Sequence, residues 1–268
     1  MRKNQEITLS AEVEDKLIAI GDIHGLTQWQ KVVEAHPTAN HYVFLGDYCD
    51  PYGTTIQDET VVDNLINILA FKHKYPERVV LLLGNHDMHY LIPSLPKGSR
   101  YNLSLAMMLH DLFENNQTSF QTAFACNRLL FTHAGITSSW LQVFRGKSEP
   151  LGTDESIQGD LSAQSLARQL NERTDDPVMM QCSFLRGGFS NYGGPFWADI
   201  EEFTEDELLP GQVQIVGHNR VSSIEVKGAS IATTGYIIFC DSLYRDHFLV
   251  VEHPTSEEPD IYEDHLKK

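Results

Sequence analysis

Residues 16–25 read Lys-Leu-Ile-Ala-Ile-Gly-Asp-Ile-His-Gly, an apolar run that ends in glycine and two side chains able to bind a metal. A short apolar run bounded by glycine has the length and composition of a buried β-strand. Glycine at the end of the strand permits a sharp turn and a close approach of neighbouring backbone. The stretch therefore predicts a buried strand that places Asp22 and His24 at the edge of a sheet.

The same junction, a strand followed by glycine and a short polar side chain, recurs along the chain. It is found in Gly46-Asp47-Tyr48-Cys49-Asp50, Gly84-Asn85-His86-Asp87 and Gly217-His218-Asn219. A related segment, Thr132-His133-Ala134-Gly135, places a histidine after another strand. Binding sites in open α/β sheets lie beyond the carboxyl ends of the strands, so these polar side chains can converge on one point.

The segments between these strands indicate an α/β fold. Apolar residues repeat every three or four positions within residues 26–33 and 62–69, which predicts two amphipathic helices between parallel strands. Further helices are predicted over 101–113 and, on the surface, 162–172, with a β-hairpin over 119–132. Short strands are expected at 213–216, 222–226, 231–233, 236–240 and 247–251. We expect a single domain over residues 1–268, with a polar excursion at about 146–177 and a frayed tail at 255–268.

The composition excludes several classes of protein. The chain carries 20 Lys+Arg against 37 Asp+Glu, a formal net charge of −17, which argues against binding to nucleic acid or to an anionic membrane. It contains neither an apolar run long enough to span a bilayer nor the apolar core of a signal peptide. Its four cysteines stand more than fifty residues apart, which favours free thiols. These features predict a cytoplasmic protein without a membrane partner.

The donor set at the strand ends is typical of a transition-metal site. Mixed imidazole and carboxylate donors suit Mn²⁺ or iron, with Zn²⁺, Co²⁺ or Ni²⁺ as alternatives, whereas Mg²⁺ and Ca²⁺ prefer oxygen alone. Six donors exceed the need of one tetrahedral ion, which favours two ions bridged by a carboxylate. Two such ions roughly 3.5–4 Å apart activate a water and clamp a phosphoryl group. The eight other histidines, among them His89, are expected on the surface or in the core.

Taken in order, the segments give the series G-D-x-H-G, G-D-x-x-D, G-N-H-D, H-A-G and G-H. This series resembles the calcineurin-like metallophosphoesterase superfamily, and within it the bacterial protein-phosphatase-like branch that also contains symmetrical diadenosine tetraphosphatases. The resemblance covers Gly21 to Asn219, about three quarters of the chain. It implies two mixed β-sheets packed as a sandwich, flanked by helices, with a dinuclear site at one edge.

The resemblance also implies roles for individual residues. Asp22 and His24 would bind the first metal, Asp47 would bridge the two, and the second metal would be held by Asn85, His133 and His218. His86 would be the general acid or the contact to the phosphate and leaving group, and Asp50 would orient its ring.

Three departures from the family pattern bear on the substrate. Protein phosphatases read Asp-Arg-Gly where this chain has Asp50-Pro51-Tyr52-Gly53, so the phosphate-binding arginine is missing there, and Arg186 and Arg220 are the candidate replacements. The ending G-H-N-R differs from the G-H-x-H of many nucleases and phosphodiesterases. Asp50 also stands where purple acid phosphatases carry a tyrosine ligand, which disfavours that class.

We therefore expect a metal-dependent hydrolase of phosphomonoesters, on a phosphoprotein or a small metabolite, in which a hydroxide held between two ions attacks phosphorus. The alternatives are a hydrolase of dinucleoside polyphosphates and a non-catalytic scaffold of the same fold. Residues 146–197, between the last two motifs, are expected to determine substrate choice. The oligomeric state is left open.

Overall fold

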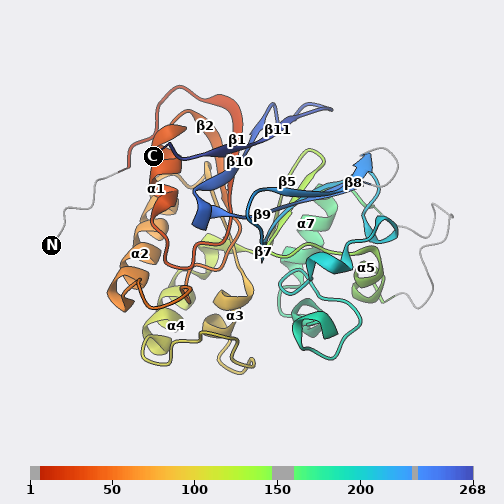
Figure 1. The fold of residues 1–268 in the computed structure, drawn as a ribbon, viewed down its shortest axis with the longest axis horizontal. Coiled ribbons are helices and arrows are strands. Elements are labelled where there is room, and N and C mark those ends of the chain that lie inside the picture. The colour runs from red at the N-terminus through yellow and green to blue at the C-terminus, as the bar shows by residue number, and fades with distance from the viewer. Residues whose placement is uncertain (1–6, 147–159, 231–234, 268) are drawn as a thin grey trace.

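Two β-sheets form the centre of the computed structural model, which describes residues 7–146, 160–230 and 235–267 (Figure 1). The first sheet has the strand order β11-β10-β1-β2-β3-β4. Its strands are Glu14–Ile20 (β1), Ala39–Phe44 (β2), Val79–Leu82 (β3), Phe120–Gln121 (β4), His247–Glu252 (β10) and Asp260–His265 (β11). The second sheet has the order β5-β6-β7-β9-β8. Its strands are Ala123–Cys126 (β5), Leu129–Thr132 (β6), Val213–Arg220 (β7), Glu225–Ser230 (β8) and Gly235–Asp241 (β9).

Both sheets are mixed. Strands β1 to β4 run parallel, and β10 and β11 are antiparallel additions at one side. In the second sheet β6, β7 and β9 run parallel between the antiparallel edge strands β5 and β8. The parallel strands of each sheet therefore end at one common edge. This architecture confirms the predicted α/β fold of two mixed sheets flanked by helices.

The two sheets pack face to face through alternate side chains of their central strands. Leu17 and Val43 of the first sheet belong to the same buried cluster as Phe131 and Ile215 of the second. The intervening residues, such as Ile18, point to the other face and belong to the cluster formed with the helices. Burial on both faces explains why β1 is continuously apolar rather than alternating.

Helices cover the outer faces of the sandwich. Four lie beside the first sheet in Figure 1: Gln28–Ala35 (α1), Asp58–Lys74 (α2), Asn85–Leu91 (α3) and Ala106–Asn115 (α4). Two lie beside the second sheet: Ser138–Phe144 (α5) and Ala163–Glu172 (α7). Short 3₁₀ turns occur at Gln117–Ser119, Pro177–Met180, Phe184–Arg186, Ile200–Glu202, Glu205–Glu207 and Leu243–Arg245. No helix in the described parts of the chain is both long and apolar enough to cross a membrane.

The structure differs from the predicted hairpin over 119–132. Residues 120–121 pair with β3 in the first sheet, whereas residues 123–126 pair with β6 in the second. The chain crosses between the sheets at Thr122, where the Asn171 side chain of α7 accepts hydrogen bonds from the backbone N–H groups of Thr122 and Ala123. The predicted surface helix is thus α7, but it covers the second sheet instead of forming an excursion. Residues 147–159 of that excursion lie outside the described residues.

The C-terminal segment also differs from its prediction. The tail expected to fray from residue 255 contains β11, which pairs with β10 from His247↔His265 to Glu252↔Asp260. The segment is expected to fray because it is acidic, but the side chains of Ile261 and Leu266 pack against the two hydrophobic cores. Strand β8 begins at Glu225 and not at residue 222, and helix α4 begins at Ala106 and not at residue 101. The strand predicted at 231–233 lies outside the described residues.

Candidate metal centre

The predicted metal donors come from strand ends at one edge of the sandwich. Strands β1, β2 and β3 lie side by side and parallel, so the segments that carry Asp22, Asp47 and Asn85 leave the sheet at the same edge. His133 follows β6 and His218 lies in the neighbouring strand β7. Because the sheets pack face to face, the two edges meet. All six predicted donors are buried there: Asp22, His24, Asp47, Asn85, His133 and His218.

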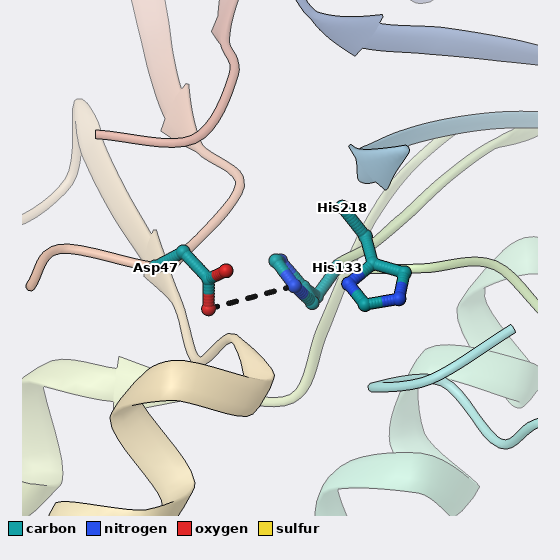
Figure 2. A group of neighbouring side chains, drawn as sticks. All are labelled: Asp47, His133 and His218. Carbon is teal, nitrogen blue, oxygen red and sulfur yellow. Dashed lines mark ion pairs between the residues drawn. The ribbon is translucent and has the colours of Figure 1, made fainter. Parts of the chain in front are cut away.

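These donors form two groups that share Asp47. Asp22, His24 and Asp47 each offer one ligand atom within 4.8 Å of the others, and so do Asp47, His133 and His218. His24 Nε2 lies 3.5 Å from Oδ2 of Asp47, and His133 Nε2 lies 3.6 Å from Oδ1. Figure 2 shows the Asp47 carboxylate opposite the rings of His133 and His218. The two oxygens of one carboxylate therefore face different groups, as a bridging ligand requires.

Asn85 joins the second group through its side-chain oxygen. This Oδ1 atom lies 3.0 Å from His133 Nε2 and 2.9 Å from His218 Nδ1. His133 Nδ1 lies 2.7 Å from the carbonyl oxygen of Leu45, and a neutral ring that donates there carries a lone pair on Nε2. Two acceptor atoms, His133 Nε2 and Asn85 Oδ1, then face each other without a proton between them. A cation would satisfy both, so the donor set fits a metal.

The histidines of the two groups are held in the neutral form that binds metals. Burial is the main cause: it lowers the pKa of His24 to about 4 and also lowers the pKa of His133 and His218. His24 Nδ1 lies 2.8 Å from the carbonyl oxygen of Cys49, which leaves its Nε2 facing the carboxylates. Backbone acceptors thus orient the rings of His24 and His133 toward the site.

Negative charge is crowded around the first group. Burial, followed by the charges of Asp241 and Asp47, raises the pKa of Asp22 well above its usual range. Burial and Asp47 likewise raise the pKa of Asp241, the last residue of β9, to about 7. Asp241 is absent from the sequence prediction because no glycine precedes it, although it does stand at a strand end. Bound cations would relieve this repulsion.

Asp87 is a fourth buried carboxylate, but its surroundings give it a structural role. It accepts hydrogen bonds from the backbone N–H groups of Asp47 at 2.8 Å, Tyr48 at 2.9 Å and Gly84 at 2.8 Å. The side chain therefore ties the turn after β2 to the turn after β3. It fixes the position of the shared Asp47 without facing either group.

The geometry explains why glycine precedes the donors. A Cβ atom on Gly84 would lie 2.2 Å from Asp47 Oδ1, and one on Gly217 would lie 2.2 Å from Asp22 Oδ1. The donor segments are also strained, since His24, Asp47 and His218 have left-handed φ values of 41°, 54° and 60°. Such conformations cost about 1–3 kcal/mol each and concentrate at functional sites.

His86 and Asp50 lie together beside the two groups. His86 Nδ1 is 2.7 Å from Asp50 Oδ2, and His89 Nε2 is 2.9 Å from the same oxygen. The Tyr90 hydroxyl donates to Oδ1 at 2.5 Å. Burial alone would raise the pKa of Asp50, but these hydrogen bonds hold it below its ordinary value. Asp50 is thus an ionised anchor for the His86 ring, whose centroid lies 5.3 Å from that of His24. His89 is buried, as expected of a core histidine, yet it belongs to this network.

The arginine nearest to His86 is one that the sequence prediction missed. Arg100 donates from Nη2 to His86 Nε2 at 2.9 Å, and its guanidinium lies 3.6 Å from the centroid of the Tyr52 ring. Its Nε atom is buried without a hydrogen-bond partner in the described part of the chain. Arg100 follows no recognisable motif, and only its left-handed φ of 63° marks it as unusual.

The two predicted arginines lie near the site but already have partners within the protein. Arg186 forms an ion pair with Asp199, whose Oδ2 lies 2.5 Å from Nε, and hydrogen-bonds to Asn219. The Arg220 guanidinium lies over two aromatic rings, 4.3 Å from the centroid of Tyr52 and 3.6 Å from that of Tyr244. Tyr52 therefore contacts both Arg100 and Arg220, while its own ring lies 4.9 Å from that of His24.

A family model and two solved structures match this chain. Residues 16–218 match the family model of the calcineurin-like phosphoesterases. Among solved structures, a protein serine/threonine phosphatase from Saccharomyces cerevisiae with similarity to human phosphatase PP5 matches with a TM-score of 0.50 at 14% identity, over 97% of this chain and 85% of that one. A phosphopantetheinyl hydrolase from Mycobacterium tuberculosis matches with a TM-score of 0.34 at 10% identity, over 85% of this chain and 89% of that one.

The fold and the family match define a hydrolase that acts on phosphoester bonds. The chain belongs to the calcineurin-like phosphoesterase family. Members of this family depend on metals, which agrees with the two aspartate and histidine groups that meet at Asp47.

Proposed function

We propose that the protein hydrolyses phosphomonoesters at a dinuclear transition-metal centre, with manganese or iron as the metal. The observation that carries this proposal is Asp47, whose two carboxylate oxygens face two separate groups of donors. Asp22, His24 and Asp47 would hold one ion, and the other would be held by Asp47, Asn85, His133 and His218. Two bound cations supply Lewis-acid activation of a water and neutralise the charge of the phosphoryl group.

His86 would protonate the departing oxygen of the ester. Its Nδ1 faces Asp50, so Nε2 is the atom that can carry the transferred proton. Asp50 is itself fixed by His89 and Tyr90, which restricts the His86 ring to one orientation. After the alcohol has left, His86 must regain a proton from solvent before the next turnover.

Arg100 would bind the phosphate in place of the arginine missing after Asp50. Its Nη2 atom reaches His86, its Nε atom has no partner in the described structure, and stacking on Tyr52 holds the guanidinium plane. An incoming phosphate can accept from these donors and release His86 Nε2 for proton transfer. Arg186 is less suited because Asp199 already pairs with it, and Arg220 because, unlike Arg100, it makes no hydrogen bond to His86 in the described structure.

Replacing Arg100 with glutamine should lower kcat/KM for a phosphomonoester by about 10- to 100-fold, the effect of losing a charged hydrogen bond. Arg100→Lys should recover only part of this loss, because the lysine ammonium group lacks the planar guanidinium that stacks on Tyr52 and offers several N–H donors. The measurement is steady-state kinetics beside metal content, with Arg168→Gln on the exposed face of α7 as the control. Unchanged kinetics for Arg100→Gln would remove Arg100 from the site.

Metal removal should destabilise the protein because the buried carboxylates Asp22, Asp47 and Asp241 then repel one another. Saturating Mn²⁺ should raise the Tm of the chelator-treated protein by roughly 5–10 °C for each occupied site, the shift expected at about 100-fold excess over Kd. Ca²⁺ should give a smaller shift because it prefers an all-oxygen donor set. Differential scanning calorimetry provides the test, and an equal Tm with and without Mn²⁺ would contradict a metal centre.

A substrate comparison tests the proposed reaction itself. With Mn²⁺ bound, the protein should release phosphate from p-nitrophenyl phosphate and other monoesters faster than it cleaves diadenosine tetraphosphate. Preference for diadenosine tetraphosphate would favour a dinucleoside polyphosphate hydrolase instead. Two bound metals without turnover of either class of substrate would favour a non-catalytic scaffold.

A further inference from the structure

A cavity of about 440 Å³ opens beside the candidate metal centre. Asn85 and His89 line its inner side, and both belong to the site described above. Trp197 lines it as well, and the Trp197 ring lies 5.9 Å from the ring of His218, centroid to centroid. The cavity is therefore continuous with the metal donors, and its volume falls in the roughly 300–1,000 Å³ range of small-molecule sites.

The outer wall of the cavity presents an apolar side chain on a fixed loop. Phe189 lines the cavity and is 94% exposed. The loop that carries it is closed by backbone hydrogen bonds, from Phe184 N–H to the Ser190 carbonyl at 3.0 Å and from Gly188 N–H to the Ser183 carbonyl at 2.8 Å. Phe184 and Leu185 of the same loop are also largely exposed, and an exposed group of large apolar side chains is typical of a binding surface.

The cations of the cavity wall are already engaged within the protein. Lys97 donates from Nζ to the carbonyl oxygens of Pro93 at 2.8 Å and His89 at 3.2 Å. Arg186 is paired with Asp199. The remaining wall is largely apolar and includes Leu95, Pro96, Met180, Phe189 and Trp197. The apolar part of this wall suits an uncharged apolar group.

We propose that this cavity binds the group esterified to the phosphate, and that the substrates are monoesters of compact apolar alcohols, aliphatic or aromatic. The inference rests on the proposed function: with the phosphate at the metal centre, the group bound to the ester oxygen enters past Asn85 and His89. Water forms the new P–O bond, the ester P–O bond breaks, and the alcohol leaves with a proton from His86. A peptide backbone in the cavity would leave its amide groups unpaired against an apolar wall, which disfavours a phosphoserine protein.

The n-alkyl phosphates from ethyl to hexyl test this inference, because their leaving oxygens have closely similar basicity and differ mainly in apolar area. With the Mn²⁺-loaded protein, kcat/KM should rise about 2- to 4-fold for each added methylene group. Phe189→Ser should reduce this slope, whereas Leu103→Ser, at an equally exposed residue that does not line the cavity, should leave it unchanged. Both side chains are largely in solvent, so neither substitution should disturb folding.

A binding measurement separates this inference from the proposed function. Calorimetry with ethyl- and hexylphosphonate, which cannot be hydrolysed, should show tighter binding of the longer ligand in wild type and a smaller difference in Phe189→Ser. Turnover or binding independent of chain length would overturn the cavity assignment and leave the phosphomonoesterase proposal standing. A phosphoserine peptide that outperforms every alkyl phosphate would also overturn it. Absence of turnover despite length-dependent phosphonate binding would contradict the proposed function alone.

Discussion

Asparagine in place of Asp47 should remove most of the bound metal and lower phosphoesterase turnover by at least about 10³-fold, since activation of water and charge neutralisation both depend on the ions. Asp47 is the side chain that both donor groups share, so its substitution weakens both sites at once. Asparagine tolerates the left-handed backbone at this position. Its side-chain oxygen can still accept the hydrogen bond that the backbone N–H of His86 donates to Asp47 Oδ1 at 2.8 Å. The loss should therefore reflect the missing charge and not a misfolded loop.

Metal analysis and calorimetry check this expectation together. Wild type should carry close to two metal equivalents and the Asp47→Asn variant less than one, while calorimetry should show a cooperative unfolding transition for both metal-free proteins. Asp63→Asn, at an exposed position on α2, is the matched control. A variant that retains two equivalents and full turnover would refute the bridging role of Asp47.

Substitution of His86 by asparagine should lower turnover by about 10²- to 10⁴-fold, the usual contribution of a general acid. Metal content should stay at the wild-type level, because His86 bonds to Arg100 and lies with Asp50 and His89 in a separate cluster, outside the two donor groups that share Asp47. The loss should be larger for an alkyl phosphate than for p-nitrophenyl phosphate, whose weakly basic leaving oxygen needs no proton.

That dependence on the leaving group separates an acid from a structural histidine. A residue that only supports Asp50 would slow both substrates alike when it is replaced. His73→Asn, at an exposed position in the last turn of α2, controls for the chemistry of the substitution. Equal losses for the two substrates, or full activity, would exclude His86 as the general acid.

Much of the fold was predictable because its signals are local. Strands β1, β2, β3 and β7 contain apolar runs that lead to glycine, and Gly84 and Gly217 are required there by the approach of a carboxylate oxygen. Strand pairing was harder to predict. Residues 120–126 read as one strand, yet they divide between two sheets, because the hydrogen bonds that separate them come from Asn171, about fifty positions away.

The same contrast applies to the candidate site. The sequence singles out the six candidate donors because each follows an apolar run, and the structure brings them together at one edge. Three other residues of the site could not be predicted in this way. Arg100 contacts His86, and His89 contacts Asp50, but neither belongs to a strand-end motif. Asp241 stands at a strand end but lacks the preceding glycine. The cavity wall unites residues 95–98 with residues 180–190, a juxtaposition with no counterpart in the order of the chain.

The sequence by itself determined the family, the parallel strands and which residues are candidate metal donors, because glycine-bounded apolar runs and the polar residues that follow them are properties of short segments. Only the tertiary structure decided which arginine meets His86, which carboxylates repel one another, and what surface lies beside the centre. Those properties depend on distances between segments far apart in the chain, and such distances are set when two sheets bury their apolar faces against each other.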